Sequence, residues 1–141
     1  MDLARCFLPL LGTWTGLERL PLDDGDPVTA RASLVLRLDV SGTAVVQDYR
    51  QVRSDGTEFT AHGVFRPVEP DQIRWWLFDS TGGEPALATG RFDGGALVLE
   101  SPDRRHRFRG QGDDLEQQVD ARTAAGWRPA LAGRYRRLSG H

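Results

Sequence analysis

Apolar and polar residues alternate along most of this chain with a period of two, which is the pattern of β-strands that bury one face. In residues 29–40, the even-numbered positions from 32 onward hold alanine, leucine or valine, and most positions between them are polar. In residues 57–68, Phe59 and Phe65 fall on one face, whereas His62 falls on the other. These segments predict half-buried strands that have a defined inner face.

Glycine, proline, aspartate and serine end the alternating segments at short intervals. Ser41-Gly42 and Asp55-Gly56 are strong hairpin signals, because both dipeptides favour the backbone conformations of tight turns. The predicted strands are residues 12–18, 29–40, 43–53, 57–68, 72–79, 84–92, 96–100, 104–110, 115–122 and 127–138.

About ten strands joined by short turns leave two all-β architectures, a sandwich and an up-and-down barrel. We predict a single antiparallel up-and-down β-barrel, because closure removes the exposed edges of an open sheet. The barrel domain is expected to cover residues 1–141 and to begin with a short N-terminal helical turn that ends near Pro9.

Two segments suggest that the interior holds more than a packed core. Residues 43–53 place polar side chains on both faces of the strand, so either orientation brings polar groups inside. Trp75 and Trp76 are adjacent, so one tryptophan points inward and the other covers the outside or a homodimer contact; parity does not settle which. Mixed polarity of this kind is typical of a barrel with a wet or ligand-filled cavity.

The net charge, the single cysteine and the absence of lysine exclude several classes of function. The net charge of -2 gives no electrostatic reason to expect nucleic acid or a membrane as partner. Cys6 is the single cysteine, so an internal disulfide is excluded, and a cytoplasmic location is expected. All 18 basic residues are arginines, which excludes Schiff-base chemistry on a lysine.

Residues 10–16, Leu-Leu-Gly-Thr-Trp-Thr-Gly, resemble the Gly-x-Trp signature that opens the first strand of lipocalins and other calycins. The resemblance implies a lipocalin- or fatty-acid-binding-protein-like barrel in which Trp14 closes one end beneath an arginine of the last strand. Arg134, Arg136 and Arg137 are the candidates for that structural plug.

The resemblance is closer to a bacterial family of lipocalin-like, ten-stranded barrels of unknown function. It is carried by the opening motif and by residues 73–83, 90–97 and 133–138, in the same order along the chain. The sequence resembles nitrobindin-like haem barrels more distantly. Those barrels carry a proximal histidine near or within the closing strand, whereas residues 127–138 contain none. We therefore expect no haem and no other cofactor, and the spacing of the histidines favours no metal site.

Four side chains are the candidates for contact with a bound molecule. We expect Trp76 to form an aromatic wall, Tyr49 or His62 to form a hydrogen bond, and Arg107 to pair with an acidic group through its guanidinium. For each, the alternative is an outward-facing strand residue, because a one-residue slip inverts the inner set.

The favoured function is a binding protein that holds a small hydrophobic or amphipathic molecule in the barrel. The alternative is an isomerase- or cyclase-type enzyme, in which Asp48, Arg50, Tyr49 and His62 would form an acid–base cluster in the cavity. No catalytic motif identifies such residues, so no catalytic residue is assigned. A third interpretation is a structural module with a packed interior, and the volume of the interior distinguishes it from the other two.

Overall fold

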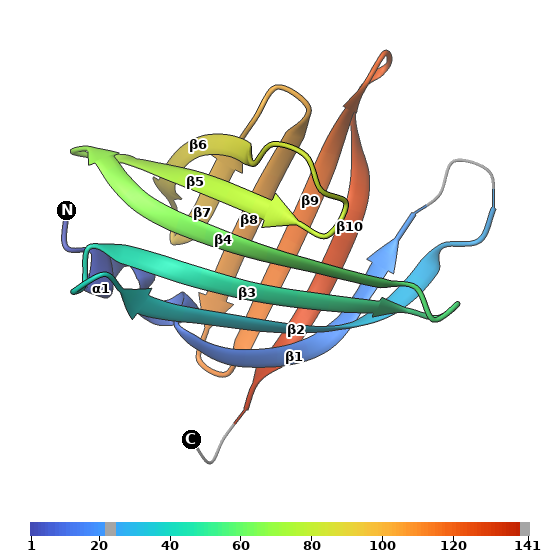
Figure 1. Cartoon of the computed structure of the whole chain (residues 1–141), viewed down its shortest axis with the longest axis horizontal. Helices are drawn as coiled ribbons and strands as arrows, with labels where there is room; N and C mark the ends of the chain where they lie inside the picture. Colours follow the sequence, from blue (N-terminus) through green and yellow to red (C-terminus); the bar gives the residue numbers. More distant parts are fainter. Residues whose placement is uncertain (22–24, 139–141) are drawn as a thin grey trace.

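The computed structural model describes residues 1–21 and 25–138 (Figure 1). The elements, in chain order, are α1 (Leu3–Phe7), the 3₁₀ turn η1 (Leu8–Leu10), β1 (Gly12–Leu20), β2 (Val28–Asp39), β3 (Ala44–Arg53), β4 (Glu58–Glu69), β5 (Gln72–Asp79), β6 (Ala86–Asp93), β7 (Ala96–Glu100), β8 (Arg104–Gln111), β9 (Asp114–Thr123) and β10 (Gly126–Arg137). Each strand pairs antiparallel with the next, and β10 returns to β1 to close the barrel. The predicted up-and-down barrel with a short N-terminal helix is confirmed.

Register and alternation together define the inner surface of the barrel. Trp14 of β1 lies opposite Leu34 of β2, and both side chains are fully buried. On β5 the inner residue is Trp75, which is 2% exposed, whereas Trp76 points to the outside next to Arg74. The structure therefore settles the parity of the tryptophan pair.

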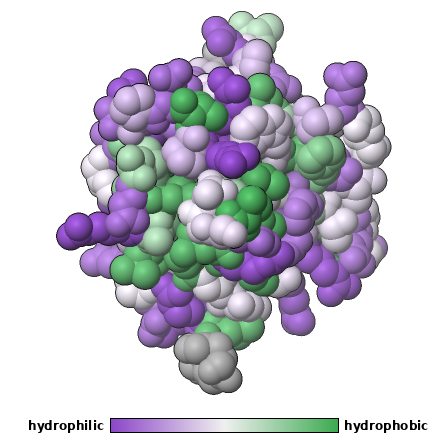
Figure 2. All heavy atoms as spheres, turned by 60° about the vertical axis from the view of Figure 1, so that its left-hand side comes forward, coloured by the Kyte–Doolittle hydropathy of each residue, from purple (hydrophilic) through white to green (hydrophobic). Residues whose placement is uncertain are grey.

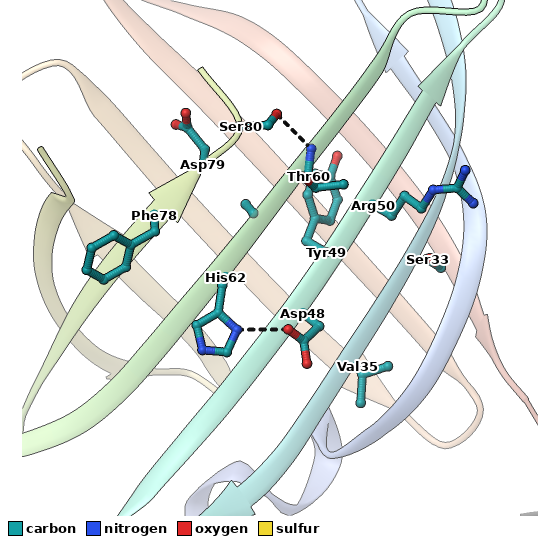
Figure 3. A pocket seen from close by; sticks show the side chains of 11 residues that line it. Ser33, Val35, Asp48, Tyr49, Arg50, Thr60, His62, Phe78, Asp79 and Ser80 are labelled. Atoms are coloured by element: carbon teal, nitrogen blue, oxygen red, sulfur yellow. Dashed lines mark hydrogen bonds and ion pairs between the residues drawn. The ribbon is translucent and has the colours of Figure 1, made fainter. Parts of the chain in front are cut away.

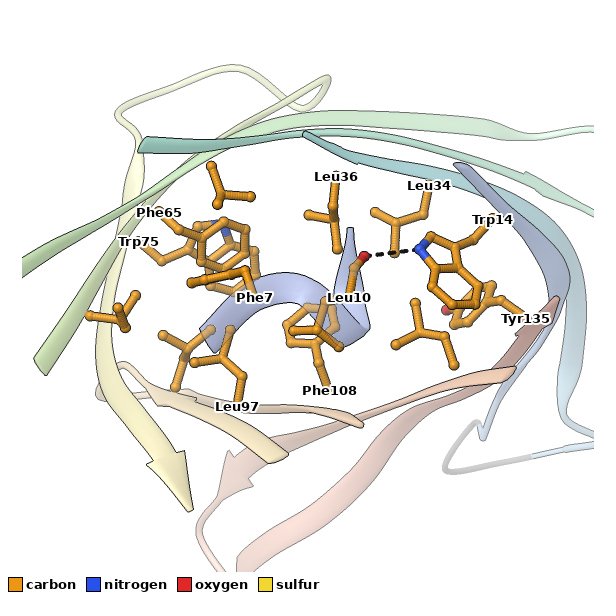
Figure 4. Packing of buried hydrophobic residues seen from close by; sticks show 14 of the residues in the cluster. Phe7, Leu10, Trp14, Leu34, Leu36, Phe65, Trp75, Leu97, Phe108 and Tyr135 are labelled. Carbon is orange, nitrogen blue, oxygen red and sulfur yellow. Dashed lines mark hydrogen bonds between the residues drawn. The ribbon is translucent and has the colours of Figure 1, made fainter. Parts of the chain in front are cut away.

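Large apolar side chains fill the end of the barrel that α1 and η1 close (Figure 4). Phe7 is fully buried and packs its ring against Phe65 and Phe92, with centroids 5.4 and 5.2 Å away. Burial of an aromatic side chain of this size contributes about 2 kcal/mol or more. The N-terminal segment is thus part of the core and blocks one end of the barrel.

Of the three arginines that are candidates for the plug, Arg137 is the one that lies against Trp14. The Trp14 indole donates a hydrogen bond to the Leu10 carbonyl at 3.0 Å, and the Arg137 guanidinium lies 4.2 Å from the ring centroid. Arg137 is directly opposite Trp14 in the β1–β10 register. Arg134 and Arg136 have the other parity, and their side chains are 88% and 75% exposed, so the roles predicted for them fall to Arg137.

The inner face of β2 ends earlier than the sequence pattern predicts. Leu38 is 37% exposed and Val40 is 56% exposed, because the end of β2 and the turn after it extend beyond the packed core. Figure 2 shows apolar residues gathered, among hydrophilic ones, on the side of the molecule that lies at the left in Figure 1.

Candidate functional site

The barrel interior contains a cavity of about 460 Å³ at the end away from α1. Leu20 and Arg53, which end β1 and β3, and Phe59 near the start of β4 place it at that end. The lining residues are Leu20, Gln47, Tyr49, Gln51, Arg53, Phe59, Ala61, Trp75, Leu77, Asp79, Ala86, Ala88, Ser101, Asp103, Arg104, His106, Gln117, Val119, Ala130 and Leu131. The wall combines aromatic and small apolar side chains with a few amides, as in small-molecule pockets.

Trp75 is the central aromatic side chain of this wall. Its ring stacks on Phe65 with centroids 5.1 Å apart and planes 4° apart, while His106 meets it edge-on at 4.7 Å. The indole Nε1 donates a hydrogen bond to Gln47 Oε1 at 3.1 Å. Gly63 makes this arrangement possible, because a Cβ at that position would lie 2.5 Å from both bonded atoms.

His106 is an uncharged side chain at neutral pH. Burial lowers its pKa from 6.5 to about 4, with a further lowering from the positive charge of Arg104 and an opposing effect of Asp103. Its Nδ1 is sealed from solvent and has no hydrogen-bond partner among the described residues. The ring thus faces the cavity as a neutral imidazole.

A buried carboxylate lies behind this wall. Glu18 is 2% exposed and accepts hydrogen bonds from the hydroxyls of Tyr49 and Tyr135, at 2.6 and 2.5 Å, and from Gln51 Nε2 at 2.8 Å. Burial raises the pKa of both tyrosines, and the Glu18 charge raises it further, so the hydroxyls stay protonated. Gly133 leaves room for this network, since a Cβ there would lie 2.2 Å from the Tyr135 hydroxyl.

The Glu18 network acts as a support for the cavity wall. Glu18 and Tyr135 do not line the cavity, whereas Tyr49 and Gln51 do. Three donors satisfy the carboxylate, which offsets the cost of burying its charge. Arg53 extends the network toward the mouth, because its Nε donates to Gln51 Oε1 at 3.1 Å.

The mouth of the cavity carries charges of both signs. Arg53 and Arg104 line it together with Asp79 and Asp103. Arg104 lies 3.7 Å from Asp103, and both side chains are about half exposed or more. This polar rim surrounds an apolar interior, so the cavity suits a molecule with an apolar body.

A second hollow, of about 480 Å³, lies on the outer face of β2–β5 (Figure 3). There His62 Nδ1 lies 2.8 Å from Asp48 Oδ1, and Arg37 donates to Asp48 Oδ2 at 2.9 Å. The hydrogen bond to His62 lowers the pKa of Asp48, and that to Arg37 adds to the effect. Asp48 and His62, which were predicted to belong to an acid–base cluster in the cavity, therefore do form a pair, but the pair lies on the outer face of the barrel.

Of the four predicted contact residues, only Tyr49 lines the interior cavity. His62 is on the outer face, in the hollow that Figure 3 shows. Trp76 also points outward, beside Arg74, and Arg107 lies in an outer groove that Arg109 shares. The structure thus does not bring the four side chains together, and any ligand contact by the three outer ones stays a prediction.

Sequence reasoning did not select Gln47, Glu18 or His106 for the interior. A signal was present for His106, which shares a strand face with Phe108, and Phe108 is 1% exposed. Gln47 has the parity of Val45, which is fully buried. Among residues 1–21 and 25–138, no group of three or more His, Cys, Asp or Glu side chains is placed to hold a metal ion. Nor does the described part of the chain contain a helix long and apolar enough to cross a membrane.

No protein-family model matches the chain, and no curated protein matches it either. Among solved structures, Rv2717c from M. tuberculosis matches with a TM-score of 0.80 at 17% identity, covering 99% of each chain. The S-type phycobiliprotein lyase CPES from Guillardia theta matches with a TM-score of 0.71 at 12% identity, covering 100% of this chain and 95% of that one. Zebrafish ileal bile acid-binding protein, solved with cholic acid, matches with a TM-score of 0.53 at 14% identity, covering 92% of this chain and 99% of that one. The chain has a calycin-like, ten-stranded barrel fold that is similar to these proteins.

Proposed function

We propose that this chain is a binding protein that holds a small apolar or amphipathic molecule in the interior cavity. The observation that carries the proposal is the cavity itself. Its volume of about 460 Å³ lies in the range of ligand pockets, about 300–1,000 Å³. A barrel that served only as a packed structural module would fill this space with side chains.

The distribution of polarity supports the same function. Trp75, Leu77 and Val119 provide apolar contact area, while the arginines and aspartates stand at the mouth. Transfer of an apolar molecule into such a pocket gains about 25 cal/mol per Å² of buried apolar surface. The fold adds an analogy: the zebrafish barrel was solved with cholic acid, which is an amphipathic molecule.

Native mass spectrometry of protein purified from its own host tests the proposal directly. We expect a mass above that of the chain, which denaturation returns to the mass of the chain alone. The retained molecule can then be identified from the denatured sample. A chain that carries no extra mass and binds no apolar probe would contradict the proposal.

A probe titration with matched variants shows whether binding takes place inside the barrel. Ala86 is exposed at the start of β6 and lines the mouth of the cavity, whereas its neighbour Leu87 has the opposite parity and does not line it. We expect Ala86→Phe to weaken binding of 2-ethylnaphthalene at least fivefold in calorimetric titrations, because the new ring obstructs the mouth of the cavity. Leu87→Phe adds a similar ring to the outer face and should leave the affinity unchanged. Equal effects of the two substitutions would argue against the interior site.

A further inference from the structure

Gln47 presents a hydrogen-bond donor to the cavity. The indole nitrogen of Trp75 can only donate, so the amide oxygen of Gln47 must be the atom that faces it, 3.1 Å away. The amide nitrogen is consequently turned away from Trp75. Gln47 lines the cavity, and its Nε2 forms no hydrogen bond with any residue in the described ranges and is not sealed from solvent.

His106 presents a second donor on the other side of Trp75. Its Nδ1 is sealed among side chains and has no partner within residues 1–21 and 25–138. A neutral imidazole carries one N–H, and an N–H buried without an acceptor is less tolerated than a lone pair in the same place. The hydrogen therefore belongs on Nε2, which is not sealed from solvent, on a ring that lines the cavity.

Three of the acceptors in the cavity wall already accept a hydrogen bond from another side chain. Gln47 Oε1 accepts from Trp75, and Gln51 Oε1 accepts from Arg53. The Tyr49 hydroxyl donates to Glu18 and accepts from Gln51 Nε2 at 2.9 Å. Among residues 1–21 and 25–138, neither Gln47 Nε2 nor His106 Nε2 forms a hydrogen bond with a protein acceptor, so the wall beside Trp75 offers two donors to a bound molecule.

We infer that the ligand of the cavity carries an uncharged oxygen acceptor, of the ketone, ester or amide carbonyl class. This oxygen accepts hydrogen bonds from His106 Nε2 and Gln47 Nε2 beside the Trp75 ring. This inference rests on the proposed function. An anionic oxygen fits the same place less well, because the buried Glu18 carboxylate lies just behind Tyr49. Arg53 and Arg104 stand at the mouth, where an anion would keep part of its hydration.

Three naphthalenes of matched size test this inference: 2-acetylnaphthalene carries the carbonyl, 2-ethylnaphthalene replaces it with methylene, and 2-naphthoate carries a charge. In calorimetric titrations we expect the ketone to bind about tenfold more tightly than the hydrocarbon, as one or two satisfied hydrogen bonds predict. The naphthoate should bind more weakly than the ketone.

Three variants show which side chains cause the preference for the ketone over the hydrocarbon. His106→Phe keeps an aromatic ring on Trp75 and removes the donor, while Gln47→Glu keeps an acceptor for the indole and removes the amide N–H groups. Each should lower the ketone preference at least threefold. Gln118→Glu makes the same amide-to-carboxylate change at an exposed side chain of β9 that does not line the interior cavity, and should leave the preference at its wild-type value.

The outcomes separate the two proposals. If none of the probes binds and the purified protein retains no molecule, the proposed function fails and the inference fails with it. If 2-ethylnaphthalene binds but the ketone gains nothing, or keeps its advantage in both interior variants, the inference is wrong and the binding function stands. Tighter binding of 2-naphthoate than of the ketone would also overturn it. The nitrogen chemical shifts of His106 in the unliganded wild-type protein add a test without substitution: we expect the Nε2–H tautomer, and the Nδ1–H tautomer would refute the inference.

Discussion

Replacement of Arg137 by alanine should open the plugged end of the barrel. The guanidinium lies 4.2 Å from the Trp14 ring centroid, and its nitrogens donate to the carbonyls of Leu11 and of Gly112, the latter at 3.2 Å. The side chain is only 26% exposed. A partly desolvated cation–π contact contributes about 1 kcal/mol, and hydrogen bonds from a charged group add about 1.5 kcal/mol or more. We therefore expect Arg137→Ala to lower the free energy of unfolding by about 2–3 kcal/mol.

Urea denaturation followed by tryptophan fluorescence measures this change. With a slope of about 1–3 kcal/mol per M, the midpoint should fall by roughly 1 M or more. Arg136→Ala is the matched control, because the one side-chain contact of Arg136 among the described residues is an exposed ion pair with Asp114 at 3.2 Å, which predicts a loss of about 1 kcal/mol or less. Arg137→Lys should fall between the two, since lysine keeps the charge but lacks the planar group. An Arg137→Ala midpoint no lower than that of Arg136→Ala would refute the plug.

Three other substitutions test the interior. Gly63→Ala places a Cβ 2.5 Å from Gln47 Oε1, so the amide must move, and differential scanning calorimetry should show a lower Tm than in the wild type. Tyr135→Phe removes a donor from the buried Glu18 carboxylate and should cost about 1.5–3 kcal/mol in urea unfolding; an unchanged midpoint would show that water replaces the hydroxyl. The pKa of His106 is about 4 in the folded protein, against 6.5 in the unfolded chain. As the pH falls from 6.5 to 4, the unfolded chain therefore binds a proton at His106 that the folded protein does not, and the free energy of unfolding decreases. Over that range the wild type should lose about 3 kcal/mol more than His106→Phe, and parallel pH profiles of the two proteins would contradict the depressed pKa.

The barrel was predictable because its signals are local. Alternation identifies the strands, and glycines at tight turns separate them. Gly42 and Gly56 adopt φ angles of 79° and 87°, which residues with a side chain rarely adopt. Both follow a polar residue that favours turns, so the dipeptides Ser41-Gly42 and Asp55-Gly56 mark the hairpins without reference to the rest of the fold.

The orientation of individual side chains was less predictable, because it depends on packing across strands. Leu77 and Phe78 put apolar residues on both faces after the tryptophan pair, and only Ile73 and Arg74 before it favour Trp75 as the inner residue, so alternation alone is a weak guide here. Trp75 is inside because its ring stacks on Phe65 of the neighbouring strand. His62 points outward, because its position on β4 has the opposite parity to Phe65, and Phe65 packs inside against the N-terminal helix. Placing His62 in the cavity contradicted the alternation of its own strand.

The position of the cavity follows from the sizes of the inward-facing side chains along each strand. On β4 the inner residues change from Phe65, at the end that α1 closes, to Gly63 and Ala61 toward the open end. On β6, Ala88 and Ala86 line the cavity, and neither reaches the barrel axis. In a closed barrel of ten strands, small inward-facing side chains leave space where large ones leave none. Once the parity of one strand is fixed, the register fixes the others, and the sequence then shows that this barrel is packed at one end and hollow at the other.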